Sequence, residues 1–289
     1  MMPQPFLERS AVLERVALCA LVALSAGCAT RRLAGKDLDR VVRPAYISRI
    51  EEGAGPKSLV FREDGSYGEK LKKLETREAD RRLHVKLTQA VTRFEVSERL
   101  RTTTLNLLPR EKPWTSTVNP AQVATALESF LVEEVPANPP DYDLLKPLGA
   151  DAVVEFVVEE YGIKSADGKA GAYIEGYGRM FELESRDELW RRPFHYDQVN
   201  DGTANLDPFR VGKEPELFRL ALTTLLDKIS ADFAKDLSPP DRRGGPALSS
   251  GPEQTAPDST NTTGAPASAP LPASGSEELA PGELPSPDP

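Results

Sequence analysis

The sequence predicts an α+β fold: a mixed, largely antiparallel sheet flanked by helices and followed by a disordered C-terminal tail. Three observations predict this fold. Residues 150–196 contain three apolar-rich segments separated by short loops, which is typical of an antiparallel meander. Apolar residues at helical spacing precede and follow these segments. From Ser238 onward, proline, alanine, serine and glycine replace the large apolar side chains, so this part of the chain cannot bury a core.

The chain of 289 residues divides into four expected parts. Residues 1–27 have the pattern of a targeting segment that is removed, and residues 28–56 are expected to form a modified N-terminus and linker. Residues 57–237 suit a single globular domain. Residues 238–289 contain no aromatic residue, and ordering them would cost about 1–2 kcal/mol per residue without enough apolar burial to offset it. We expect a solvated tail or spacer there, or alternatively a tether that reaches toward peptidoglycan or a partner protein.

Local patterns predict the elements in the first half of the domain. Residues 57–61 read KSLVF and predict a short strand, which the turn residues at 64–65 close. From Tyr67 to Phe94, leucines and a valine recur at three- and four-residue steps and predict one or two amphipathic helices. The β-branched run from Thr102 to Leu108 predicts another strand.

The next helix is predicted to begin at Asn119, which can cap it, while Pro120 suits the first turn. Its apolar stripe consists of Val123, Leu127, Phe130 and Leu131. Prolines at positions 136, 139 and 140 end this helix. Residues 144–149 then predict a short helical turn that ends at a glycine.

The second half of the domain carries the clearest strands. Residues 150–161 read ADAVVEFVVEEY and predict a central strand, because apolar side chains occupy both of its faces. Residues 172–183 and 189–196 predict two further strands of the meander. A final helix is predicted from Pro215, with an apolar face that should pack on the sheet. That face comprises Leu217, Leu220, Ala221, Leu225, Ile229 and Phe233.

An apolar segment near the N-terminus ends at a cysteine. Residues 16–26 read VALCALVALSA, which is too short to span a membrane but has the length of the apolar region of a secretory signal peptide. The small residues Ser25, Ala26 and Gly27 then precede Cys28. This pattern resembles the lipobox of bacterial lipoproteins, although that family prefers leucine at the position that Ser25 occupies. A thiol is the side chain best suited to form a thioether with a diacylglyceryl group.

The lipobox resemblance implies a location and a membrane anchor. It implies cleavage between Gly27 and Cys28, two acyl chains on the Cys28 sulfur, and a third chain such as palmitate on the new amino group. Each buried methylene contributes about 0.8 kcal/mol, so two chains hold a protein stably in a bilayer. Because Ala29 rather than aspartate follows the cysteine, the resemblance implies the periplasmic face of the outer membrane. Residues 28–56 would then be a lipidated N-terminus and linker.

A second resemblance covers residues 144–192. A short helix leads into Gly149-Ala150-Asp151 and the central strand, and Leu189-Trp190 lies on a later strand. This arrangement resembles periplasmic accessory lipoproteins of the curli-secretion and penicillin-binding-protein-activator type. The resemblance implies a mixed sheet flanked by helices, and it carries over no catalytic residue.

Composition and motifs argue against several function classes. A net charge of -9 with a pI near 5.0 argues against a nucleic-acid-binding protein. Removal of residues 1–27 would leave Cys28 as the single thiol, so no intramolecular disulfide is expected, and the distant His84 and His195 predict no metal site. No cofactor is expected, because Gly176-Tyr177-Gly178 lacks the third glycine of a dinucleotide-binding loop. Hydrolase and nucleotide-binding signatures such as GxSxG and the Walker A motif are absent from the sequence.

Two sets of side chains on the predicted strands are candidates for function. Glu155, Glu159 and Glu175 are carboxylates that could act as acid and base, or that could simply lie on a solvated face beside Arg179. Aromatic side chains alternate on the last two strands and would form a cross-strand ladder if their faces coincided. They are Tyr173, Tyr177 and Phe181 on one strand, and Trp190, Phe194 and Tyr196 on the next. Such a ladder would be core under the final helix, or else a surface for a partner or peptide.

The sequence therefore predicts a membrane-anchored envelope lipoprotein without catalytic residues. Its expected role is a scaffold or accessory factor for a periplasmic or outer-membrane assembly, with an envelope protein or peptidoglycan as partner. The alternative is an envelope hydrolase that acts on glycan and uses Glu155 or Glu175.

Overall fold

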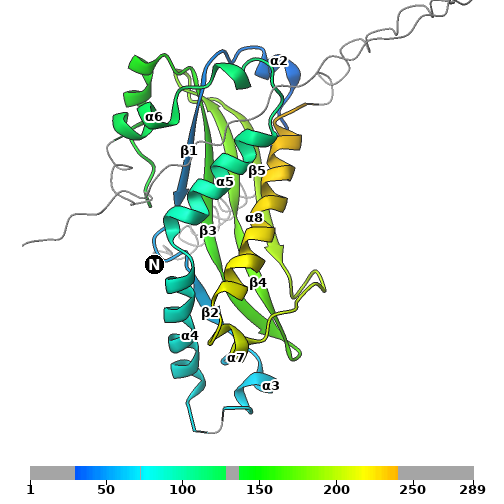
Figure 1. The fold of residues 1–289 in the computed structure, drawn as a ribbon. Coiled ribbons are helices and arrows are strands. Elements are labelled where there is room, and N and C mark those ends of the chain that lie inside the picture. Colours follow the sequence, from blue (N-terminus) through cyan, green and yellow to red (C-terminus); the bar gives the residue numbers. More distant parts are fainter. Residues whose placement is uncertain (1–29, 72, 128–136, 240–289) are drawn as a thin grey trace, which may run out of the picture. The chain divides into compact units, whose positions relative to one another are not determined.

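A five-stranded mixed sheet organises the computed structural model, which describes residues 30–71, 73–127 and 137–239 (Figure 1). The strands are β1 (Pro44–Ile50), β2 (Lys57–Leu59), β3 (Ala152–Ala166), β4 (Lys169–Glu182) and β5 (Glu188–Asp197). Strands β3, β4 and β5 form an antiparallel meander, while β1 and β2 both pair with β3 in parallel. The α+β class and the three strands predicted for residues 150–196 are confirmed.

The two faces of the sheet are covered differently. The longest helices, α4 (Thr76–Ala90), α5 (Arg93–Leu107) and α8 (Glu216–Asp236), lie on one face, which we call the helix face; α5 and α8 lie side by side across it (Figure 1). On the opposite face, which we call the second face, α6 (Pro120–Ala126) and η3 (Tyr142–Leu148) cover one end. The remaining short helices are α2 (Gly35–Leu38), α3 (Gly65–Gly68), η2 (Trp114–Ser116) and α7 (Pro208–Val211).

Several helix predictions are confirmed by their caps. The Asn119 side chain accepts a hydrogen bond from the Ala121 N–H at 2.8 Å and opens α6, and Gly149 ends η3 with a left-handed φ of 77°. The final helix occupies residues 216–236, as its apolar spacing predicts, but Leu220 of the predicted apolar face is exposed to solvent. Phe130 and Leu131 of the predicted stripe lie outside the described residues, as do the targeting segment and nearly all of the predicted tail.

The strand predicted for Thr102–Leu108 is wrong, because these residues form the last turns of α5. A capping box starts this helix: the Thr92 hydroxyl accepts from the Glu95 N–H at 3.1 Å, and the Glu95 carboxylate accepts from the Thr92 N–H at 2.8 Å. The buried Thr104 hydroxyl donates to the Leu100 carbonyl at 2.7 Å, so the helix satisfies it. Packing of α5 against α8 thus outweighs the β-propensity of the threonines.

The linker expected for residues 28–56 is also corrected, because β1 lies within it. All seven residues of β1 are buried, and Pro44 pairs with Ala152 at the start of a parallel ladder that runs to Ile50 and Val158. The folded domain therefore begins well before residue 57. Ser48 and Arg49 interrupt the apolar pattern of β1, and its partner strand is more than a hundred residues away, so local periodicity gives little signal for it.

An aromatic cluster joins α8 to the helix face. The Phe233 ring stacks on Phe156 at a centroid distance of 5.1 Å and meets Trp190 edge-on at 5.3 Å and Phe194 at 5.6 Å. Gly178 makes room for this cluster, since a Cβ there would lie 2.5 Å from the Trp190 ring. Gly178 thus has a packing role at the centre of the core.

Replacing Phe233 with alanine is expected to lower the free energy of unfolding by about 3–5 kcal/mol, because the cavity removes contacts to three buried rings. Urea unfolding followed by circular dichroism measures this loss. The matched control is Leu220→Ala on the same helix, whose side chain is 64% exposed, and it should change stability by less than about 0.5 kcal/mol. Equal stabilities of the two variants would contradict the prediction.

Candidate functional site

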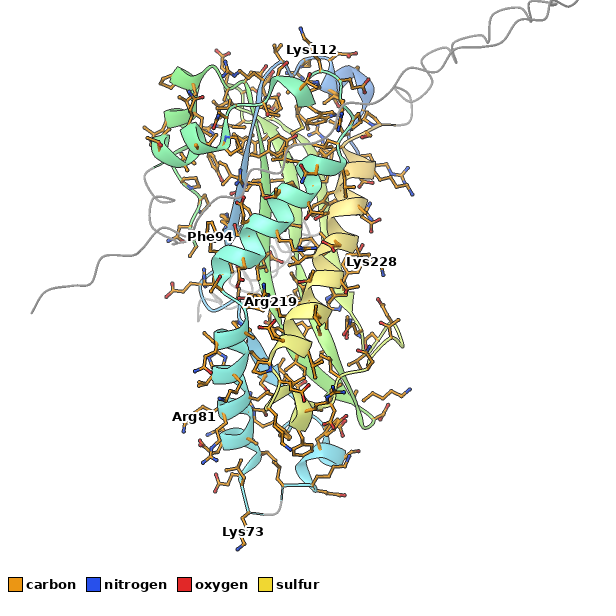
Figure 2. The ribbon with its side chains drawn as sticks, viewed as in Figure 1. Lys73, Arg81, Phe94, Lys112, Arg219 and Lys228 are labelled. Carbon is orange, nitrogen blue, oxygen red and sulfur yellow. The ribbon has the colours of Figure 1, made fainter. Side chains whose placement is uncertain are left out.

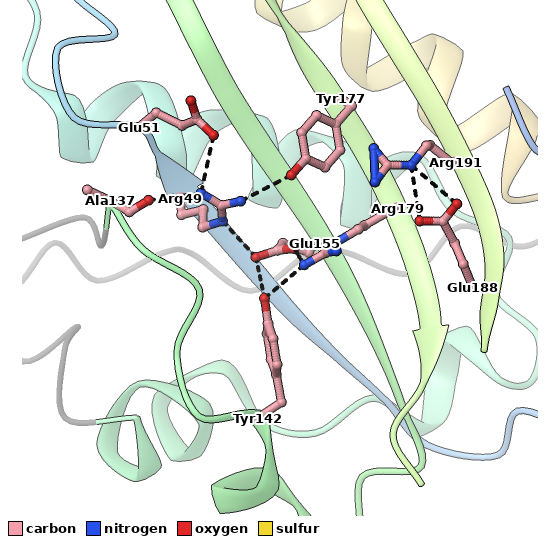
Figure 3. A network of polar contacts seen from close by, with 9 residues as sticks. All are labelled: Arg49, Glu51, Ala137, Tyr142, Glu155, Tyr177, Arg179, Glu188 and Arg191. Carbon is pink, nitrogen blue, oxygen red and sulfur yellow. Dashed lines mark hydrogen bonds and ion pairs between the residues drawn. The ribbon is translucent and has the colours of Figure 1, made fainter. Parts of the chain in front are cut away.

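A network of charged and phenolic side chains occupies the second face of the sheet (Figure 3). Its members come from β1, β3, β4 and η3, and the sheet register places them together. Glu155 pairs with Ile47 of β1 and with Arg179 of β4, while Val157, two residues on, pairs with Arg49 and Tyr177. Because side chains two residues apart share a face, Glu155, Arg179, Arg49 and Tyr177 all project to the same side.

Glu155 is the centre of the network, and its side chain is completely buried. The Arg49 Nε donates to Glu155 Oε1 at 2.9 Å, and the Arg179 Nε donates to Oε2 at 2.5 Å. The Tyr142 hydroxyl donates to Oε1 at 2.7 Å. A buried carboxylate needs such partners, because an unpaired charge in a low-dielectric interior is very costly. Both oxygens of Glu155 are therefore engaged.

Arg49 ties the network to two other parts of the chain. Its side chain is 5% exposed, and its two Nη atoms donate to the Ala137 carbonyl at 2.8 Å and to the Tyr177 hydroxyl at 3.1 Å. The Glu51 carboxylate lies 3.7 Å away at the exposed rim (Figure 3). The planar guanidinium thus uses its donors in three directions, which a lysine ammonium could not reproduce.

The pKa values of two phenols and one guanidinium in the network are raised. Burial, and then the negative charge of Glu155, raise the pKa of Tyr142, and burial raises the pKa of Tyr177. Burial acts to lower the pKa of the Arg179 guanidinium, but the charge and hydrogen bond of Glu155, together with Tyr142 and Tyr177, outweigh burial and raise that pKa. Both phenols therefore stay protonated and the guanidinium stays charged at neutral pH, and the hydrogen bonds of Tyr142 join η3 to β3 and β4.

Glu155 and Glu175, the two carboxylates of the hydrolase alternative, are not brought together as an acid and base pair. Glu155 lies opposite Arg179, whereas Glu175 lies opposite Glu160, five residues further along β3. At about 3.3 Å per residue, the backbones of Glu155 and Glu175 lie about 13–16 Å apart along the strands, whereas the carboxyl groups of a glycosidase pair lie roughly 5 to 9.5 Å apart. Glu175 instead lies 2.9 Å from His195 Nδ1 at the exposed end of the face. Glu159 is exposed at a bulge, where partial burial and the charges of Glu51 and Glu175 raise its pKa.

The two sets of aromatic side chains do not form a ladder, because they lie on opposite faces of the sheet; the alternative of core packing under the final helix is confirmed for Trp190 and Phe194. The register pairs Trp190 with Met180 and Phe194 with Gly176, which places both rings in the core beneath α8. Tyr173 and Tyr177 project to the second face. There the Tyr173 hydroxyl donates to Glu160 at 2.7 Å, and the Tyr177 hydroxyl accepts from Arg49.

Arg49 and Tyr142 were not predicted as site residues from the sequence. Both donate hydrogen bonds to the Glu155 carboxylate. An arginine inside the apolar run PAYISRI was the available signal, since a charge in a strand interior needs a buried partner. Cys28 and Gly27 lie outside the described residues. Within the described ranges, no cluster of three or more histidine, cysteine or acidic residues could hold a metal ion, and no helix is long and apolar enough to cross a membrane.

Replacing Tyr142 with phenylalanine is expected to lower the free energy of unfolding by about 1–3 kcal/mol. The Tyr142 hydroxyl donates to Glu155 Oε1 at 2.7 Å and accepts from an Arg179 Nη at 3.1 Å, and the substitution removes both hydrogen bonds. The matched control is Tyr46→Phe, since the buried Tyr46 hydroxyl has no hydrogen-bond partner among the described residues. That variant should be neutral or slightly stabilised in urea unfolding. A Tyr142 variant as stable as the Tyr46 variant would show that the phenol does not stabilise the network.

No protein-family model and no curated protein matches the chain. Among solved structures, it is similar to a dodecameric PelC variant from Paraburkholderia phytofirmans, with 10% identity, 72% of this chain and 94% of that chain covered, and a TM-score of 0.30. It is also similar to the hypothetical protein CT253 from Chlamydia trachomatis, with 13% identity, 68% and 98% coverage, and a TM-score of 0.33. At these scores neither likeness assigns a fold or a function.

Proposed function

We propose that this chain is a lipid-anchored envelope protein that acts as a non-catalytic scaffold or accessory factor for a periplasmic or outer-membrane assembly. The observation that carries the anchor is the sequence LVALSAGC at residues 21–28, an apolar run that stops at small residues and one cysteine. Cleavage before Cys28 and acylation of its sulfur would place the folded domain on a bilayer, on the periplasmic face of the outer membrane.

The scaffold role is supported by how the polar groups of the sheet are used. The most enclosed cluster of charges, around Glu155, is saturated by Arg49, Arg179 and Tyr142 within the fold. A general acid or nucleophile needs a free atom that can reach a substrate, and both oxygens of Glu155 are occupied. The separation of Glu155 from Glu175 likewise disfavours the alternative of a glycan hydrolase.

The proposal is tested by recovering the acylated chain from membranes with its neighbours. Cells that express the protein are labelled with a fatty-acid analogue, crosslinked in the envelope and solubilised before capture. We expect label on the captured chain and one reproducible envelope protein or peptidoglycan fragment crosslinked to it. A labelled chain that crosslinks to nothing reproducible would contradict the scaffold role, and a chain without label would contradict the anchor.

A further inference from the structure

The N-terminal segment is attached to the edge of the sheet almost immediately after Cys28. Arg31 forms two backbone hydrogen bonds with Arg191 of β5, one donated by each N–H, at 2.8 and 2.9 Å. Leu33 is then buried in the core, and α2 follows. The position of the chain is therefore fixed from Arg31 onward by the outer edge of β5.

This attachment limits where a membrane can lie, an argument that rests on the proposed acylation of Cys28. Only Ala29 and Thr30 separate Cys28 from Arg31. Three residue steps of about 3.3–3.6 Å reach at most about 11 Å, even in a fully extended chain. The anchor on Cys28 would thus hold the β5 edge near Arg191 within about 11 Å of Cys28, a distance of up to about two head-group layers.

The segment beside this edge is basic. Residues 29–36 contain Arg31, Arg32 and Lys36 and no acidic residue. All three side chains are exposed, and none of them forms an ion pair with another described residue. Cations held next to a membrane surface are attracted to anionic phospholipid head groups, and arginine suits phosphate because its donors match two phosphate oxygens.

The same edge is poorly suited to a protein strand. The N–H and C=O of Arg191 both point outward to Arg31, so the next outward position along β5 is Pro193. Pro193 is exposed and has no N–H to donate, which blocks an added strand at this point. Lipid therefore fits the chemistry of this edge better than an added peptide strand.

We propose that Arg31, Arg32 and Lys36, next to the edge of β5, dock on anionic phospholipid head groups and orient the anchored domain. In this orientation β5 faces the bilayer and the start of α4 is directed away from it. Lys73, just before α4, marks the end of the described domain opposite to α2 (Figures 1 and 2).

The test uses the mature acylated chain in vesicles of phosphatidylcholine with and without phosphatidylglycerol. Acylation of Cys28 is first established by mass spectrometry. Since Cys19 precedes the cleavage site, no other thiol remains, and a fluorophore can be placed at Pro193→Cys or at Lys73→Cys. With nitroxide-labelled head groups, we expect strong quenching at position 193, weak quenching at position 73, and a larger difference when phosphatidylglycerol is present.

Charge variants distinguish the contribution of the basic side chains from that of the lipid anchor on Cys28. Replacing Arg31, Arg32 and Lys36 with glutamine should reduce the ratio of docked to undocked domains by about fivefold per cation on anionic vesicles. The control replaces the exposed Arg77, Lys86 and Lys169 with glutamine, which changes net charge equally and should leave the ratio unchanged. Equal quenching at positions 193 and 73 of the acylated chain would overturn the docking. So would an equal loss of docked domains in the two triple variants. Absence of acyl chains from Cys28 would overturn the proposed function and this orientation with it.

Discussion

Replacing Glu155 with glutamine is expected to lower the free energy of unfolding by about 3–5 kcal/mol, the largest stability effect that a single polar substitution should have in this domain. The amide keeps the shape of the side chain but removes the charge that compensates Arg49, which is 5% exposed, and Arg179. Two guanidinium groups would then share a largely buried site, with the half-exposed Glu51 carboxylate 3.7 Å from Arg49 as the counter-charge that remains. Domains of this kind are stable by only about 5–15 kcal/mol, so a shift of this size is readily measured by urea unfolding.

The matched control is Glu175→Gln, which lies on the same face of the sheet. Glu175 pairs with His195, and the side chains are 40% and 54% exposed, so the change should cost less than about 1 kcal/mol. A double variant that combines Glu155→Gln with Arg49→Met should cost less than the sum of the single changes, because the two residues belong to one network. A Glu155 variant within 1 kcal/mol of the unaltered protein would show that solvent reaches the network and screens it.

The elements that could be predicted from sequence are those whose partners lie nearby in the chain. Strands β3, β4 and β5 are joined by short connections, and each carries enough apolar side chains to be recognised by itself. The apolar face of α8 is equally visible, because it repeats over 21 residues. In these segments local pattern and tertiary packing require the same conformation.

Long-range pairing explains what could not be predicted. Strand β1 joins the sheet through a parallel ladder to β3, and only that pairing explains why its Arg49 is buried beside Glu155. Thr102–Leu108 has strand-like residues, but α8 provides a surface on which a helix packs better. The network around Glu155 draws on residues 49, 142, 155 and 179, and no local spacing connects them.

The aromatic residues show the same limit at a finer scale. Alternation along each strand correctly separates its two faces, since Tyr173 and Tyr177 share one side of β4 and Trp190 and Phe194 share one side of β5. The register between β4 and β5 decides which side of β4 lies on the same face of the sheet as a given side of β5. A shift of one residue exchanges the faces, and the observed register places the two sets on opposite sides of the sheet.

Replacing Cys28 with serine is expected to abolish membrane attachment while leaving the folded domain unchanged. Serine preserves the size of the side chain, but its hydroxyl is a far weaker nucleophile than a thiol and would not form the thioether to a diacylglyceryl group. Each methylene lost from the bilayer removes about 0.8 kcal/mol, so losing both sulfur-linked chains should remove stable anchoring altogether. The domain should keep its stability, because Cys28 precedes the described residues, among which Arg31 makes the first backbone hydrogen bonds to the sheet.

The measurement combines incorporation of a fatty-acid analogue with sedimentation of membranes washed in high salt. The chain offers a matched control in Cys19→Ser, the same substitution nine residues earlier, within the segment that cleavage would remove. The Cys19 variant should be labelled and should sediment like the unaltered protein, whereas the Cys28 variant should be unlabelled. Labelling of both variants, or of neither, would contradict acylation at Cys28. Because the wash screens ionic contacts with head groups, a Cys28 variant held only by Arg31, Arg32 and Lys36 should also leave the membrane, which separates the covalent anchor from the docking that we propose.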